Sequence, residues 1–285
     1  MPPQTPRRPP LWTLGIAVAA CLLLAACGSS GNASGSSSKQ AGDPNIQALP
    51  GWAYRLHVRI LSPQSPATVT QNEVTLQLAF SGYTPSCLDA GTPPERGEGH
   101  YHVLLDGTLV DMFCTPAVTI SFQNVPPGHH SITVVPALNN HVEVTPNAAD
   151  LRVDYQPASP LPTIPPAAKS AGRPAIQIVS PATGTRVSGL FTMSVAVQNF
   201  QLSCPLLGKP PVAGYGAWNL NLDSLNGPSG GANMATMARI SCVDSIQLST
   251  QGIPRGQHAF IAYLVNTRQQ PVVPLASAQV VLDVG

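Results

Sequence analysis

The stretch His100-Tyr101-His102-Val103-Leu104-Leu105-Asp106 has a counterpart later in the chain, Ala217-Trp218-Asn219-Leu220-Asn221-Leu222-Asp223. In both stretches every second residue is apolar or aromatic, the period of two that predicts a β-strand with one buried face. Tyr101 and Trp218 occupy the same position, and we expect both side chains to point into a core. The same strand pattern therefore occurs twice in the chain.

The surrounding sequence extends this repeat. Residues 54–155 can be laid over residues 175–284. The anchors are Ile60-Leu61-Ser62-Pro63 with Ile178-Val179-Ser180-Pro181, Cys87 with Cys204, Cys114 with Cys242, and Pro126-Pro127-Gly128-His129-His130 with Pro254-Arg255-Gly256-Gln257-His258. Because each module holds one pair of cysteines, the repeat predicts the disulfides Cys87–Cys114 and Cys204–Cys242. The alternative, a cysteine metal site, lacks the close Cys-x-x-Cys spacing of zinc ribbons.

The turn and strand signals predict the fold class. In the first module short alternating runs occur at residues 55–61, 74–80, 100–106, 109–113, 118–122, 130–135 and 151–155. No segment has convincing helical periodicity. Seven short strands in about 100 residues are typical of an immunoglobulin-like sandwich. We therefore expect an all-β chain of two tandem immunoglobulin-like antiparallel β-sandwich domains, residues 50–156 and 175–285, joined by a Pro-rich linker at 157–174.

The N-terminal segment has the pattern of an export signal. Arg7 and Arg8 precede an apolar stretch, residues 11–24, which is too short to span a membrane. It ends in Leu24-Ala25-Ala26-Cys27-Gly28, which resembles a bacterial lipobox. That resemblance implies removal of residues 1–26 and lipid attachment to Cys27, so the membrane is an expected partner and the cell envelope the expected location. Residues 27–49, rich in Gly and Ser, are expected to be a flexible tether.

Composition argues against two function classes. Charged residues make up 9% of the chain and its formal net charge is +1, so no basic patch favours nucleic acid as a partner. The sequence has no Gly-x-Ser-x-Gly elbow. Once Cys21 leaves with the signal peptide, Cys27 carries lipid and both disulfides form, no cysteine is left as a nucleophile. We therefore expect a protein that is not an enzyme.

A further resemblance concerns the histidines. Gly99 through Asp106, then Pro127-Gly128-His129-His130 and Asn140-His141, resemble an uncharacterised bacterial family of exported domains marked by a Gly-His-His-His-Leu-Leu-Ile-Asp strand. Tyr101 stands where that motif has its middle histidine. The resemblance implies exported β-domains and no particular activity.

His100, His102 and His141 are candidate metal ligands of the first module. The first two lie two residues apart on the strand face opposite Tyr101, where we expect them to reach solvent. Sandwich topology brings His141, in the loop after the sixth strand, to the same end of the domain. Three imidazoles suit copper or zinc, and Glu98 and Glu143 are possible oxygen ligands. Two functions stay open, a non-catalytic binding or scaffold module with an unknown envelope partner, and a copper- or zinc-binding lipoprotein.

Overall fold

The computed structural model describes residues 49–168, 172–226 and 233–285. The expected signal peptide, Cys27 and the tether up to residue 48 lie outside the described residues. Within the described part of the chain, no helix is long and apolar enough to cross a membrane. Its helical segments are 3₁₀ turns of three residues each: η1 (Ala53–Arg55), η2 (Thr145–Asn147), η3 (Cys204–Leu206) and η4 (Met234–Thr236).

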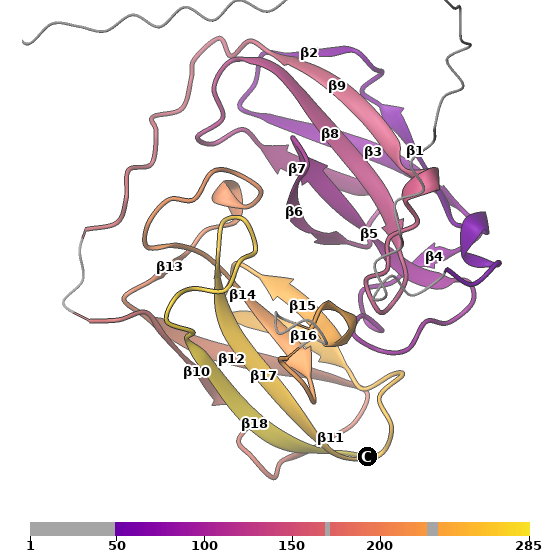
Figure 1. Ribbon diagram of the computed structural model, residues 1–285, viewed down its shortest axis with the longest axis vertical. Helices are drawn as coiled ribbons and strands as arrows, with labels where there is room; N and C mark the ends of the chain where they lie inside the picture. The colour runs from indigo at the N-terminus through magenta and orange to yellow at the C-terminus, as the bar shows by residue number, and fades with distance from the viewer. Residues whose placement is uncertain (1–48, 169–171, 227–232) are drawn as a thin grey trace, which may run out of the picture. The chain divides into compact units, whose positions relative to one another are not determined.

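The first module is a sandwich of two sheets (Figure 1). One sheet has the order β1-β3-β7, with β1 (His57–Ser62), β3 (Glu73–Ser81) and β7 (Ala117–Ser121). The other has the order β2-β9-β8-β5-β4, with β2 (Ala67–Val69), β9 (Ala149–Tyr155), β8 (Gly128–Ala137), β5 (Glu98–Leu105) and β4 (Thr84–Pro85), while β6 (Thr108–Phe113) also pairs with β5. Buried residues alternate with exposed ones along β3, as a strand with one face on a core requires.

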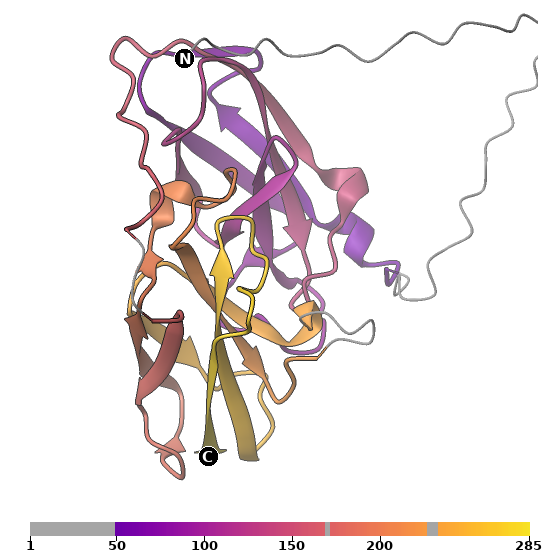
Figure 2. The ribbon, with the colours of Figure 1, turned by 60° about the vertical axis from the view of Figure 1, so that its left-hand side comes forward.

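The second module repeats this topology strand for strand. One sheet has the order β10-β12-β16, with β10 (Ala175–Ser180), β12 (Leu190–Gln198) and β16 (Ser245–Ser249). The other has the order β11-β18-β17-β14-β13, with β11 (Arg186–Val187), β18 (Ser277–Val284), β17 (Gly256–Asn266), β14 (Tyr215–Leu222) and β13 (Gln201–Leu202), while β15 (Met237–Ser241) pairs with β14. Figure 2 shows the two layers, β10 and β12 in red-brown facing β17 and β18 in yellow. The predicted fold class, two tandem sandwiches, is confirmed.

Four short strands were not predicted from the sequence. They are β2, β4, β11 and β13, and each pairs parallel with one longer strand of the same module. Each has only two or three residues, too few for an alternating pattern to be recognised. The seven longer strands of the first module overlap the predicted runs.

The disulfides form between the cysteine pairs that the repeat predicts. Cys87 is bonded to Cys114 and Cys204 to Cys242, with Cα–Cα separations of 5.6 and 5.1 Å. In each module the first cysteine follows a short parallel strand and the second follows an antiparallel one, and both strands pair with the same third strand. The disulfide thus joins two short strands that would otherwise be held by few hydrogen bonds.

Tyr101 and Trp218 occupy equivalent buried positions, and both are 0% exposed. The Tyr101 hydroxyl donates a hydrogen bond to the carbonyl of Thr115 at 2.6 Å, and the Trp218 Nε1–H donates to the carbonyl of Val243 at 2.7 Å. Each acceptor directly follows the second cysteine of its module. A large ring can be fully buried here because its one polar group keeps a partner.

The two modules pack together through the strands that carry the repeated motif. One apolar cluster contains core residues of the first module together with Leu207, Ala217, Met237, Ile240, Tyr263 and Val265 of the second. The backbones approach so closely that a Cβ added at Gly208 would lie 2.5 Å from Cγ2 of Val110. The equivalent strands β6 and β15 are in contact. The face of β5 opposite Tyr101 is therefore covered, and the expectation that it reaches solvent is wrong.

Lys209 provides a test of this packing. It is 1% exposed, and its Nζ has no hydrogen-bond partner among the described residues. Burial lowers the pKa of Lys209 to about 8. The unfolded chain binds this proton more tightly than the folded chain does. The buried charge therefore lowers the free energy of unfolding by its full amount below pH 8, and this loss disappears as pH rises toward 10.5.

We therefore expect Lys209→Met to raise the free energy of unfolding at pH 7 by about 2–3 kcal/mol. The gain should shrink markedly at pH 10.5, where lysine in the unfolded chain also loses its charge. Urea unfolding of both proteins at the two pH values measures this difference. An equal or lower stability of the variant at pH 7 would contradict the burial of an unpaired ammonium group.

Candidate metal centre

Strand pairing places the three candidate histidines at one end of the first module. β5 carries His100 and His102, and in the neighbouring strand β8 Ala137 lies opposite His100. The chain leaves β8 in a tight turn, in which the His141 N–H donates to the Leu138 carbonyl at 2.8 Å. This turn folds back over the start of β5. The convergence expected from sandwich topology is thus present in the structure.

One ring nitrogen from each histidine forms a nearly equilateral triangle. His100 Nε2 lies 3.1 Å from His102 Nε2 and 3.1 Å from His141 Nδ1. The third side, from His102 Nε2 to His141 Nδ1, is also 3.1 Å. The usual zinc–imidazole distance is about 2.0–2.1 Å. For an ion at that distance from all three nitrogens, each nitrogen–ion–nitrogen angle would be about 100°. That angle is close to tetrahedral.

Neighbouring acceptors fix the tautomers of two rings. The Nδ1–H of His102 donates to Glu143 Oε1 at 2.7 Å, and the Nε2–H of His141 donates to the Met237 carbonyl at 2.6 Å. A neutral imidazole carries one proton, so the other nitrogen of each ring has a free lone pair. Both lone pairs face the centre of the triangle. Hydrogen-bond acceptors on the outer ring nitrogen orient metal-bound histidines in this way.

Hydrogen bonds alone cannot satisfy the three contacts. A ring nitrogen is either a donor or an acceptor, so three nitrogens in mutual contact always include at least one mismatched pair. A proton on His100 Nε2 could be shared between His102 Nε2 and His141 Nδ1. The lone pairs of these two acceptors would still face each other at 3.1 Å. A bound cation would accept all three lone pairs at once. The donor set therefore fits a metal ion better than it fits a hydrogen-bond network.

Burial keeps His100 and His141 neutral. His100, His102 and His141 are 0%, 3% and 7% exposed. Burial, reinforced by the neighbouring imidazoles, lowers the pKa of His100 well below its usual value. Burial also lowers the pKa of His141 to about 3, with a smaller lowering effect from His102 and an opposing one from the Met237 carbonyl. Neutral imidazole is the form that binds metals.

The two predicted oxygen ligands are not part of the triangle. Glu143 accepts the hydrogen bond from His102, so it orients this ring from outside the triangle. Glu98 does not belong to the group of ligand atoms that converge, and its pKa is raised, chiefly by burial and then by Asp89 and Glu95. Among the described residues, the converging group consists of the three histidines alone. The converging group thus offers three ligand atoms.

His130 has a structural role that is the same in both modules. Its Nδ1 lies 2.7 Å from Asp106 Oδ2, and its Nε2–H donates to the Pro126 carbonyl at 2.9 Å. His258 repeats both contacts, with Asp223 at 2.8 Å and with the Pro254 carbonyl at 2.8 Å. Since both modules keep this arrangement, these two histidines fasten the turn that precedes a strand.

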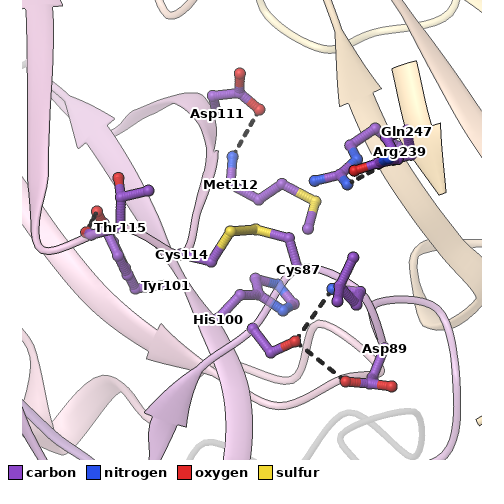
Figure 3. The surroundings of a disulfide bond; sticks show 12 residues. Cys87, Asp89, His100, Tyr101, Asp111, Met112, Cys114, Thr115, Arg239 and Gln247 are labelled. Carbon is purple, nitrogen blue, oxygen red and sulfur yellow. Dashed lines mark hydrogen bonds between the residues drawn. A yellow bond between two sulfur atoms is a disulfide. The ribbon is translucent and has the colours of Figure 1, made fainter. Parts of the chain in front are cut away.

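The Cys87–Cys114 disulfide lies beside His100. Figure 3 shows the ring of His100 next to this bond. In the second module Ala217 takes the position of His100 and Asn219 that of His102. The disulfide is thus common to both modules, whereas the histidines are particular to the first.

The contribution of Met237 could not be found by sequence reasoning. Its carbonyl belongs to the second module, 96 residues away along the chain from His141. A backbone carbonyl has no signature in the sequence, and the packing of the two modules is needed to bring it there. The role of Glu143 had one signal, its position two residues after His141.

No protein-family model and no curated protein matches the chain. Among solved structures, the fibronectin(III)-like modules of CbhA from Clostridium thermocellum are 14% identical, with a TM-score of 0.25 and coverage of 36% of this chain and 99% of theirs. A human PKD domain is 16% identical, with a TM-score of 0.22 and coverage of 38% of this chain and 88% of its own. A Dscam structure is 11% identical, with a TM-score of 0.20 and coverage of 80% and 46%. These values transfer no function to the chain.

The metal-free protein allows a test of the histidine environment. We expect His141 to stay neutral in the folded protein at pH 5, because its pKa is about 3. In urea the same residue should titrate near 6.5, the usual value for histidine. The unfolded chain thus binds the extra proton more tightly, so this group lowers folding stability as pH falls below about 6.5. Imidazole ¹⁵N chemical shifts measure both titrations, and a midpoint near 6.5 in the folded state would contradict the burial.

Proposed function

We propose that the protein binds one copper or zinc ion through His100, His102 and His141. The observation that carries this proposal is the triangle of ring nitrogens at 3.1 Å, in which two lone pairs are directed inward by partners on the outer nitrogens. Such a set of three imidazole nitrogen donors suits copper and zinc, whereas calcium and magnesium prefer oxygen. At one and the same nitrogen site Cu²⁺ generally binds more tightly than Zn²⁺, so copper is the stronger candidate.

The proposed location is the cell envelope, with a lipid anchor at Cys27. Two supports exist for it, the lipobox-like sequence and two disulfides, which are typical of proteins outside the reducing cytosol. In this proposal the protein is a tethered metal-binding module without a catalytic role. Its companion function, docking to an envelope partner through the sandwich surfaces, becomes the main interpretation if no metal binds.

Metal analysis and calorimetry test the proposal. We expect the purified chain to take up one equivalent of Cu²⁺ or Zn²⁺ at neutral pH. His102→Ala should abolish high-affinity uptake because two nitrogens remain, and Glu143→Gln should weaken it by about 10–100-fold, as loss of an outer-shell carboxylate does.

His129→Ala is the matched control, since that side chain is 91% exposed and lies outside the triangle. It should bind metal like the unchanged protein. If the unchanged protein takes up no metal, the three histidines are a buried polar cluster and the metal proposal is wrong.

The anchor is tested by Cys27→Ser. The variant should leave the membrane fraction or persist as an uncleaved precursor, because serine cannot form the thioether to a lipid. Cys21→Ser is the control, because Cys21 belongs to the segment that is removed with the signal peptide. Unchanged membrane partition and processing of Cys27→Ser, measured by fractionation and mass spectrometry, would rule out this anchor.

A further inference from the structure

We infer that the second module closes the metal centre, so that opening of the contact between the modules controls release of the ion. This inference rests on the proposed function and concerns the regulation of that same site. All three ligands come from the first module, but part of the wall around them, strand β15, comes from the second. Metal binding and module docking are then two linked equilibria.

The first support is the position of His141. Its Nε2–H donates to the Met237 carbonyl of β15 at 2.6 Å, so the second module holds one of the three ligands in place. The other ring nitrogen, Nδ1, is the one that belongs to the triangle. If β15 moves away, His141 loses the partner that fixes both its tautomer and its orientation.

The second support is a loop of the first module that lies between the histidine turn and β15. The Gly91 N–H donates to the Asn139 carbonyl at 2.7 Å, which ties this loop to the turn that carries His141. A Cβ added at Gly91 would lie 2.9 Å from the Ala238 nitrogen and 2.9 Å from the Thr236 carbonyl oxygen. Turn, loop and strand thus form one packed wall at the centre.

The third support is the burial of the ligands. His100 is 0% exposed and His102 is 3% exposed, although both lie on the outer face of their own sandwich. The same face of β14 is buried too, with Ala217 at 0% and Asn219 at 2%. An ion held by these histidines reaches solvent only after the two faces separate.

Ion binding and module docking favour each other. An ion that binds fully only to the docked arrangement stabilises the docking, and docking raises the affinity for the ion by the same factor. Weakening the contact should therefore speed metal release without removing a ligand. Loading the metal should in turn protect β15 against local opening.

Two glycine pairs allow a matched experiment. Gly91→Ala places a methyl group against β15, whereas Gly97→Ala adds it where nothing lies within 4 Å. The backbone penalty is comparable, because φ is +84° at Gly91 and +85° at Gly97. On the other module Gly208→Ala meets Val110, and its control Gly107→Ala meets nothing within 4 Å at the same φ of +76°.

The rate of Cu²⁺ or Zn²⁺ transfer from the full chain to a chromophoric chelator is the measurement. We expect Gly91→Ala and Gly208→Ala to release the ion at least about tenfold faster, the effect of losing an outer-shell support. Each control should stay within about twofold of the unchanged protein, because it disturbs no contact of the second module. Equal rates in all four variants would overturn the inference.

Hydrogen exchange on the unchanged protein gives a second measurement that needs no variant. Amides of residues 237–241 should exchange more slowly after metal loading, while those of β10 and β12, which lie in the other sheet of the second module, should not change. Uptake of metal without added protection at β15 would overturn the inference and leave the proposed function intact. A lack of uptake by the unchanged protein would overturn both.

Discussion

Burial of the outer face of β5 against the second module is the constraint on which the rest of the structure depends. A strand face in a lone sandwich meets water, and polar side chains on it need no partner. Here the face is covered, so every polar atom on it must find a partner inside the protein or lose stability. His102 and His141 meet that demand with Glu143 and the Met237 carbonyl. The three nitrogens of the triangle have only one another as partners, an arrangement that a shared cation would satisfy.

The repeat separates structural from specialised residues. Cysteines, the buried aromatic residues Tyr101 and Trp218, and the turn histidines His130 and His258 make the same contacts in both copies. Such contacts belong to the architecture of the module. The histidine triangle occurs in one copy only, within an otherwise equal frame. The module fold therefore does not require these three histidines.

Much of the fold could be predicted from the sequence, because sandwich strands leave local signals. Alternation defined β3 and β5, and matching positions in the two copies chose the disulfide partners. Even the meeting of His100 with His141 followed from the order of the strands. What sequence could not predict is contact between modules, since the Pro-rich linker permits many relative positions. The burial of His102 and the role of the Met237 carbonyl both depend on that contact.

The contact uses equivalent faces of two similar modules, as an isologous dimer does. Two separate chains that met in this way would assemble only above a certain protein concentration. The covalent linker replaces that requirement by a local effective concentration, commonly in the millimolar range for short connections. A weak contact can then stay formed at low protein concentration and still open often. If the chain binds a metal ion as proposed, its affinity for that ion becomes a property of the single chain, independent of protein concentration.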